Sequence, residues 1–451
     1  MNTKKQTATQ HLFTNKQLRT LLVPIMVEQL LSSLMGTADT MMVSNVGSAA
    51  ISAVSLVDAI NILVIQALSA LAAGGAILCS QYLGSQNLKK AKRSAEQVLF
   101  VMLVLSCSLS LLCLIFRFPL LRLIFGTVDT DVMANSQIYF FFTLLSFPFI
   151  GLYDAGASIL RAQNNTKGPM TISILSNFLN IGGNAILIFV FGMGVAGAAI
   201  STLISRIFCA IVVIWQLRNP AEQIYVRNYF SIRPDWSLIK RVLFIGIPSG
   251  IENSMFQFGK LAIQSTVSTL GTVAIAAQAM TSILEALNGI AAMGVGIGLM
   301  TVVGQCIGAK RKDEAIYYIK RLSWLSEIVI LISCAVVYLL AKPVTILGGM
   351  EAESARLCLQ MVAFITITKP ISWVLSFIPA YGMRAAGDVK FSMITSCASM
   401  WRVSLCIFLC RFCGFGPIAV WIGMFADWSV RAVVFMLRFH SRKWLQHHVI
   451  D

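Results

Sequence analysis

Charged residues are scarce in this chain. They make up 12% of its 451 residues, while 57% are hydrophobic. A soluble domain carries roughly 25% charged residues, so this chain could not cover a surface that faces water. The hydrophobic residues recur in runs such as 98–116 and 171–191, and about 20 apolar residues suffice to cross a bilayer as a helix. Because backbone polar groups in lipid must be satisfied internally and the runs do not alternate, the sequence predicts an all-α polytopic membrane protein.

The apolar runs form twelve candidate transmembrane segments. They cover residues 18–44, 50–77, 95–116, 134–157, 169–191, 195–217, 241–268, 273–303, 320–341, 357–382, 391–411 and 416–438. The first twenty residues are polar and basic and lack the short apolar core of a cleavable signal peptide, so we expect none.

Histidine is absent from all twelve segments. The four histidines of the chain lie in its tails, at His11, His440, His447 and His448. Intramembrane metalloproteases and desaturases need clusters of histidine to bind their metals. A membrane-embedded enzyme is therefore not expected, and neither is a bound organic cofactor.

Basic residues outnumber acidic ones, with 35 Lys and Arg against 19 Asp and Glu. Most of them lie in the two tails and in alternate loops, for example in 89–93, 227–241 and 310–312. This asymmetry follows the positive-inside rule and places both termini of this multi-pass protein in the cytoplasm. We expect the membrane to be the bacterial cytoplasmic (inner) membrane. Anionic membrane lipids are expected partners of the basic loops, whereas nucleic acid is not.

The second half of the chain repeats the first. At a shift of 224 residues the matched pairs include Pro24 and Pro248, Glu28 and Glu252, Gln81 and Gln305, and Gly84 and Gly308. At a shift of 223, RAQNNTK (161–167) falls on RAAGDVK (384–390). Such matches of Pro, Glu, Gln and Gly at one register indicate an internal duplication.

Each repeat contains six segments, so both enter the membrane with the same orientation. The expected architecture is two six-helix lobes related by a pseudo-two-fold axis along the membrane normal. We divide the chain into an N-lobe (1–217), a basic cytoplasmic linker (218–240) and a C-lobe (241–451, with the cytoplasmic tail). Two like-oriented bundles around a cavity that opens alternately to each side indicate a transporter.

Several segments resemble those of the multidrug and toxic compound extrusion (MATE) transporters. They are VPIMVEQLLSSLMGTADTMMVSNVG (23–47), GGAILCSQYLG (74–84), IPSGIENSMFQ (247–257) and GLMTVVGQCIGAKRKDEA (298–315). The resemblance implies export of small organic, cationic or amphipathic compounds by antiport with sodium or protons. We expect the chain to function as a monomer. The alternative is a flippase of the same superfamily for lipid-linked precursors or polysaccharide.

Two carboxylates lie within the first segment, at Glu28 and Asp39. A charged side chain in mid-helix costs about 2.5–3.5 kcal/mol on insertion scales, so each is a functional candidate. Eleven residues of an α-helix return to within about 20° of the same direction, which places both acids on one face.

Amide and hydroxyl oxygens accompany these acids on the fifth and sixth segments. Asn177, Asn180 and Asn184 recur at i, i+3 and i+7, and Thr202 follows in the next segment. Together with a carboxylate they form the oxygen-rich set that a hard cation prefers, whereas an acid alone can serve a proton.

The resemblance assigns cation binding to Asp39, Asn180, Asn184 and Thr202. If sodium is the coupling ion, Asp39 and Asn180 are the expected metal ligands. Many relatives have a second aspartate where this chain has Asn184, so the site carries one formal charge less. Both sodium and protons therefore remain open as coupling ion.

The further candidates for substrate binding or coupling are Glu28, Asn177, Glu252 and Glu285. Glu252 repeats Glu28 and is expected to face the cavity from the C-lobe. Lys369 is the expected buried cation of the tenth segment and needs an acidic partner, either Glu252 or Glu285. A structural ion pair is the alternative role for each of these acids.

The other acids of the segments are weaker candidates for a functional site. Asp427 and Arg431 are spaced i, i+4 and are expected to pair with each other. Asp58 and Asn61 share one face of the second segment. We expect such pairs to stabilise the bundle.

Overall fold

The structure is a computed structural model that describes residues 11–126 and 129–450. Residues 1–10, on which part of the signal-peptide expectation depends, lie outside the described part. Within the described ranges every regular element is a helix and there is no strand. The expected all-α class is therefore confirmed.

The N-lobe consists of α1 (Asn15–Ser44), α2 (Ser48–Gly84), α3 (Leu88–Ile115), the short α4 (Arg117–Phe125), α5 (Thr130–Ala162), α6 (Lys167–Asn184), the π-helix η1 (Ala185–Val190) and α7 (Gly194–Leu217). The C-lobe consists of α8 (Trp236–Val267), α9 (Thr272–Gly308), α10 (Lys312–Leu347), α11 (Ala352–Ala385), α12 (Val389–Ala398), α13 (Trp401–Arg411) and α14 (Ile418–His440). Three 3₁₀ turns, η2 (Tyr229–Ser231), η3 (Ser268–Leu270) and η4 (Lys443–Gln446), complete the described elements.

Eleven helical spans in the described residues are long and apolar enough to cross a membrane. One of them joins α6 to η1, and another joins α12 to α13, which the sequence predicts as a single segment. The remaining predicted segment, 241–268, corresponds to α8, which is 32 residues long. Polar residues such as Glu252, Asn253 and Gln257 interrupt its apolar character. It begins at Trp236, before the predicted 241, because the Asp235 carboxylate caps the backbone N–H groups of Ser237 and Leu238.

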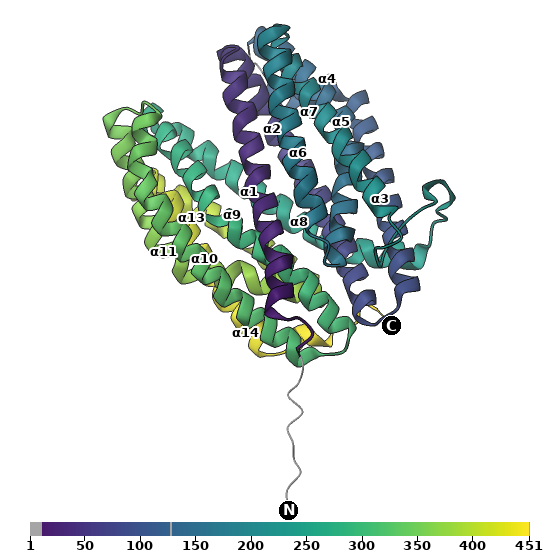
Figure 1. The fold of residues 1–451 in the computed structure, drawn as a ribbon. Helices are drawn as coiled ribbons and strands as arrows, with labels where there is room; N and C mark the ends of the chain where they lie inside the picture. The colour runs from purple at the N-terminus through teal and green to yellow at the C-terminus, as the bar shows by residue number, and fades with distance from the viewer. Residues whose placement is uncertain (1–10, 127–128, 451) are drawn as a thin grey trace, which may run out of the picture.

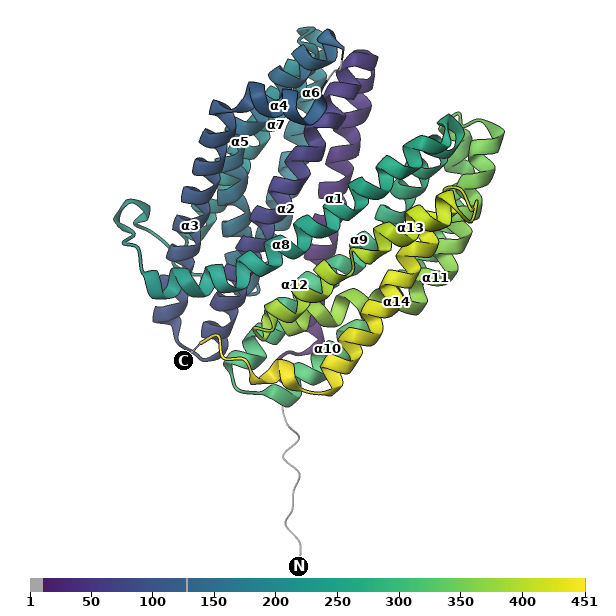
Figure 2. The ribbon, with the colours of Figure 1, turned by 180° about the vertical axis from the view of Figure 1, so that it is seen from behind.

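The two lobes separate toward one end of the molecule and meet at the other (Figure 1). The described N-terminus and the C-terminus both lie at the end where the lobes meet. From behind, α8 runs diagonally from the lower end of α3 into the C-lobe (Figure 2). We call the end that holds the termini the closed end and the opposite end the open end.

Two glutamine amides connect the lobes at the closed end in a reciprocal way. Gln81 of α2 donates a 2.7 Å hydrogen bond to the carbonyl of Ala385 in α11. Gln305 of α9 donates a 2.8 Å bond to the carbonyl of Ala162 in α5. Both donors and acceptors are pairs in the sequence repeat, so the two contacts are related by the pseudo-two-fold symmetry.

Two glycines allow α2 and α9 to cross at the same place. A Cβ atom on Gly84 would overlap the backbone of Gln305, and a Cβ atom on Gly308 would overlap the backbone of Gln81. Only glycine leaves room for this approach. The motif Q-x-x-G, which the two repeats share at 81–84 and 305–308, is thus explained by the contact between the lobes.

The first turns of α1 lie against the C-lobe, although α1 belongs to the N-lobe in sequence. The backbone N–H of Phe13 donates a 3.0 Å bond to the Tyr318 hydroxyl, and that of Leu12 donates a 2.8 Å bond to Glu314. Further along α1, Met26 packs where Gly294 of α9 leaves room. At the closed end α1 therefore connects the lobes, and its later residues are free to line the space between them.

Candidate functional site

A cavity of about 620 Å³ lies between the lobes. Its walls come from α1, α2, α5, α6 and α7 on one side and from α8, α9 and α11 on the other. Among the described residues the charged side chains that line it are Glu28, Asp39, Asp58, Asp154, Arg161, Arg206 and Arg384. The candidates Asn177 and Thr202 also line it, whereas Asn180 and Asn184 are fully buried.

The structure brings the four predicted cation-site residues together. Asn184 of α6 donates a 2.5 Å hydrogen bond from Nδ2 to Asp39 Oδ1. Thr202 of α7 donates to Asp39 Oδ2 over 3.5 Å, and Asn180 donates to the Thr202 hydroxyl over 3.3 Å. Asp39 thus stands at the cavity wall, with the amides and the hydroxyl behind it.

Two amide oxygens of this cluster have no hydrogen-bond donor. The Oδ1 atoms of Asn180 and Asn184 are buried and accept no hydrogen bond within the described part of the chain. A buried polar atom that lacks a hydrogen-bond partner costs about 1–3 kcal/mol of stability. These two oxygens are therefore expected to bind a partner. A cation bound at Asp39 would give the amide and carboxylate oxygens a common partner.

The local sequence positions α6 closely against α7. Asn184 is the last residue of α6, and the chain continues directly into the π-helix η1. Ser201 of α7 donates a 2.8 Å bond to the Asn180 carbonyl, and Gly183 has no side chain to obstruct this contact. A π-helical turn often accompanies a functional site because it shifts the register of the side chains.

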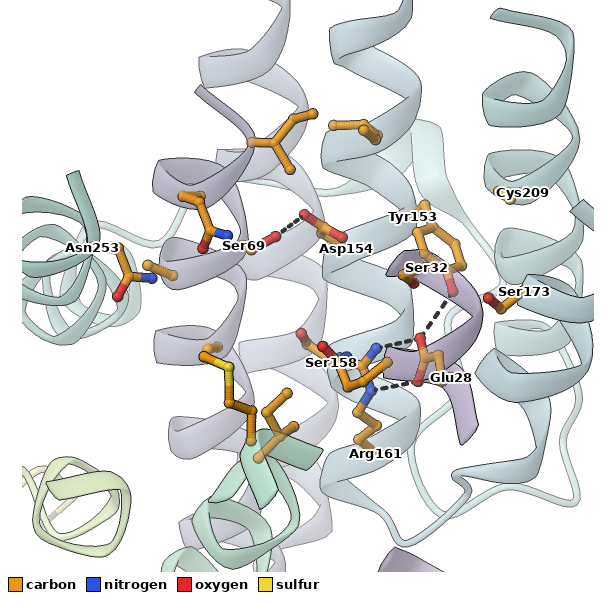
Figure 3. A pocket seen from close by; sticks show the side chains of 18 of the residues that line it. Glu28, Ser32, Ser69, Tyr153, Asp154, Ser158, Arg161, Ser173, Cys209 and Asn253 are labelled. Carbon is orange, nitrogen blue, oxygen red and sulfur yellow. Dashed lines mark hydrogen bonds and ion pairs between the residues drawn. The ribbon is translucent and has the colours of Figure 1, made fainter. Parts of the chain in front are cut away.

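Glu28 lies in the cavity wall but is paired within its own lobe. Arg161 of α5 contacts both of its oxygens, at 2.6 Å from Nη2 and 3.3 Å from Nε. The Tyr153 hydroxyl donates a third bond of 3.1 Å to Glu28 (Figure 3). Beside this cluster, Ser69 donates a 2.5 Å bond to Asp154. Glu28 is therefore a neutralised member of the wall.

Glu252 occupies the related position in the C-lobe and is also paired. Ser392 and Ser396 of α12 donate bonds of 2.8 and 2.9 Å to its two oxygens. Arg384 and Arg431 approach the same carboxylate at 3.6 and 3.7 Å. Glu252 is not among the residues that line the cavity, whereas Arg384 is.

Glu285 forms an ion pair with Lys369. The Lys369 ammonium lies 2.7 Å from Glu285 Oε1 and also donates a 3.1 Å bond to the Glu285 carbonyl. Lys369 is completely buried, and neither residue lines the cavity. Of the two partners that the sequence allows for Lys369, the structure selects Glu285 and not Glu252.

Asp427 pairs with a residue of another helix rather than with Arg431. Its Oδ2 lies 3.0 Å from Nη1 of Arg402 in α13, and both side chains are buried. Arg431 instead faces Glu252. The predicted i, i+4 pair is therefore wrong, because helices pack closely enough in the C-lobe for a partner on a neighbouring helix to compete.

Substituting Asp427→Asn is expected to destabilise the C-lobe strongly. It leaves the Arg402 guanidinium buried without a counter-charge, and breaking a buried ion pair on one side costs about 3–5 kcal/mol. Thermal unfolding of the purified protein in detergent measures the effect. The double variant Arg402→Met, Asp427→Leu, which removes both charges, should recover most of the loss. Equal stability of the single variant and the wild type would contradict this role.

Arg384 is the lining residue that the sequence analysis missed. It is the repeat partner of Arg161, and Glu252 is the repeat partner of Glu28. Combining the two registers would have predicted a Glu–Arg pair in each lobe. What the sequence could not provide is that the two pairs differ in geometry.

Comparison with known proteins agrees with this architecture. The MatE family model matches residues 24–186 and 248–408, one stretch in each lobe. The chain is 28% identical over 432 residues to the uncharacterized transporter YisQ of Bacillus subtilis, covering 94% of this chain and 93% of YisQ. It is 26% identical over 453 residues to the probable multidrug resistance protein NorM of Thermotoga maritima, covering 96% and 94% of the two chains.

Solved structures share the fold. A multidrug resistance MATE family transporter of the MOP superfamily, in an outward-facing conformation, superposes with a TM-score of 0.86 at 21% identity, covering 95% of each chain. Members of the family are transporters and not enzymes, which confirms the expectation from the sequence. The family model covers more than half of the chain, and the two lobes match its architecture. The chain therefore belongs to the MatE family, the multidrug and toxic compound extrusion transporters.

Proposed function

We propose that this protein exports small organic compounds that carry a positive charge, in exchange for sodium ions bound at Asp39. The observation that carries the proposal is the pair of buried, donor-free amide oxygens of Asn180 and Asn184 beside that single carboxylate. Asp39 contributes one negative charge beside the neutral amide and hydroxyl oxygens, and the opposite charges of Asp58 and Arg206 nearby offset each other, which suits a monovalent cation. A proton on Asp39 would provide a single O–H donor and so could satisfy at most one of the two amide oxygens, whereas a sodium ion can take both as ligands.

The amides supply a way to accommodate the ion. In this structure the Asn184 Nδ2 atom faces Asp39, and the Asn180 Nδ2 atom faces Thr202. A half-turn of each amide would present its oxygen instead of its nitrogen. Without sodium the Asn184 amide donates to the carboxylate and the Asn180 amide donates to Thr202, and with sodium both amide oxygens would join the carboxylate as ligands.

The open end of the cavity faces the outside in this proposal. The termini lie at the closed end (Figure 1), and the positive-inside rule places them in the cytoplasm of a bacterial cell. Sodium would bind at Asp39 from outside and favour closure of the open end. Substrate that enters from the cytoplasm would drive the return. Cavity and cation site both lie within one chain, so we propose that a monomer carries out the cycle.

The charge of the cavity favours positively charged cargo over lipid phosphates. Among the described residues that line the cavity there are four carboxylates and three arginines. A flippase for lipid-linked precursors needs a predominantly basic cavity to hold phosphate. Inward movement of one sodium ion releases about 2.3 kcal/mol per 100 mV, which supports roughly fifty-fold substrate accumulation.

Efflux of a fluorescent cationic dye from proteoliposomes tests the proposal, with the sodium and pH gradients varied separately. We expect an inward sodium gradient at constant pH to drive dye export. Dye movement with a proton gradient alone would replace sodium by protons as coupling ion. Absence of dye movement with either gradient would overturn the proposed function.

A further inference from the structure

The two walls of the cavity carry opposite charge. In the described part of the chain, the N-lobe wall holds four carboxylates and two arginines, namely Glu28, Asp39, Asp58, Asp154, Arg161 and Arg206. On the C-lobe wall Arg384 is the charged lining residue in the described part of the chain. Behind it lie two carboxylates and two arginines, namely Glu252, Asp427, Arg402 and Arg431. The N-lobe side is therefore net negative, and the C-lobe side is net positive.

The positive charge of the C-lobe is not neutralised within the lobe. Arg402 is matched by Asp427 at 3.0 Å, which leaves Arg384 and Arg431 to share Glu252. Glu252 already accepts hydrogen bonds from two serines, and both arginines lie beyond hydrogen-bond distance of it, at 3.6 and 3.7 Å. In addition, Nε of Arg431 is buried without an acceptor among the described residues.

Arg384 is the member of this cluster that reaches the cavity. It is 8% exposed and lines the cavity together with Tyr381, over whose ring its guanidinium lies at 4.4 Å. Its hydrogen bond to a carbonyl of its own helix, Ala380, is a long one of 3.4 Å. The guanidinium therefore lies against the Tyr381 side chain at the cavity wall, and the carboxylate that faces it in the described structure, Glu252, lies beyond hydrogen-bond distance.

Arg161, the repeat partner of Arg384, is paired more tightly. Arg161 holds Glu28 through two hydrogen bonds, the shorter one 2.6 Å long, and so has its charge matched on the same wall. The paired arginine of the N-lobe and the loosely paired arginine of the C-lobe face the same cavity. The internal duplication has thus kept the residue and changed its role.

We propose that Arg384 forms a subsite for a carboxylate group of the transported molecule, so that the preferred substrates are zwitterions. The amine or other cationic group of the substrate would face the acidic N-lobe wall, and its carboxylate would face the Arg384 guanidinium, which can bind it through two N–H donors. The Tyr381 ring beside it offers a flat apolar surface. This inference rests on the proposed export function and narrows its substrate class.

A matched pair of dyes tests the subsite. The probes are a rhodamine with a free carboxylate and the methyl ester of the same rhodamine, which is a cation without the carboxylate. Dissociation constants are measured by fluorescence anisotropy on the purified full-length protein. We expect the wild type to bind the carboxylate dye about tenfold more tightly than the ester, since a hydrogen bond to a charged group contributes that much or more.

The Arg384→Gln variant should lose this preference: it should bind the carboxylate dye about tenfold more weakly and bind the ester as tightly as the wild type does. Arg384→Lys, which keeps the charge but not the planar fork, should be intermediate. A general structural defect would lower the affinity for both dyes by the same factor, and that result would overturn the proposal. If Arg384→Gln does not fold, a wild type that fails to prefer the carboxylate dye overturns it equally. Binding of neither dye would instead count against the proposed export function itself.

Discussion

Export by the Asp39→Asn variant is expected to fall to the background of empty liposomes, while the protein is still inserted and folded. The substitution removes the carboxylate to which Asn184 and Thr202 donate. Neutral oxygens alone give a sodium ion no compensation for its charge in a largely buried site. Dye efflux driven by a sodium gradient, with protein content matched by quantitative blotting, measures the effect.

The matched control is Asp131→Asn, which changes an exposed aspartate in the first turn of α5. It should retain wild-type export, because its carboxylate contacts neither the cavity nor the cation cluster. Gradient-driven export by Asp39→Asn at more than about a tenth of the wild-type rate would contradict the assignment of Asp39.

Replacing Gly308 by alanine is expected to inactivate export almost as completely, although the site is far from Asp39 in the chain. The added Cβ atom would overlap the backbone of Gln81, so α9 could no longer approach α2 at the closed end. Backbone overlap cannot be relieved by turning a side chain, and overpacking costs about 1–3 kcal/mol. That cost applies only when this end is closed, so it would shift the population about five- to hundredfold away from the closed form.

Gly250→Ala is the control for the glycine prediction, because a Cβ atom there would meet Ala67 of the N-lobe at an ordinary distance of 3.6 Å. It adds a methyl group at another contact between the lobes, that of α8 with α2, without forcing them apart. The measurement is the rate of dye export, together with the reactivity of an introduced cysteine at Thr301, a cavity residue, toward a thiol reagent added from the side of the termini. Gly308→Ala should raise that reactivity. Unchanged reactivity and unchanged export would show that the crossing at Gly308 does not control opening.

The sequence repeat predicted more of this structure than the hydropathy did. Hydropathy indicated the number of helices, but the register of the repeat paired Glu28 with Glu252 and Gln81 with Gln305. In the structure each glutamate of the first pair faces the arginine of its own lobe, at 2.6 Å in the N-lobe and 3.6 Å in the C-lobe. The second pair forms the reciprocal contacts of the closed end. A register carries this information because duplicated lobes that pack about a two-fold axis present the same residues to each other.

The grouping of Asp39 with Asn180, Asn184 and Thr202 was also predictable from the sequence. Helical periodicity placed the amides on one face, and the family resemblance placed that face toward Asp39. The donor-free state of the two amide oxygens was not predictable. It depends on how α6 and α7 pack at the π-helix, which a regular 3.6-residue period does not describe.

The pairing of buried charges in the C-lobe could not be read from spacing. The i, i+4 rule favoured Asp427 with Arg431, yet the partners come from α13 and α8. Local spacing decides a pair only on an exposed helix face. Inside a bundle each residue also has neighbours on two or three other helices. The excess positive charge at Arg384, which depends on all of these neighbours, is therefore visible only in the three-dimensional structure.

Equilibrium binding of radioactive sodium to the purified protein tests the central claim most directly, because it isolates the ion site from transport. The wild type should bind one sodium ion per chain with saturation, and Asp39→Asn should abolish that binding. Asn180→Ala, which removes one donor-free amide oxygen, should weaken it about tenfold. Saturable binding that persists unchanged in Asp39→Asn would place the ion elsewhere and contradict the account.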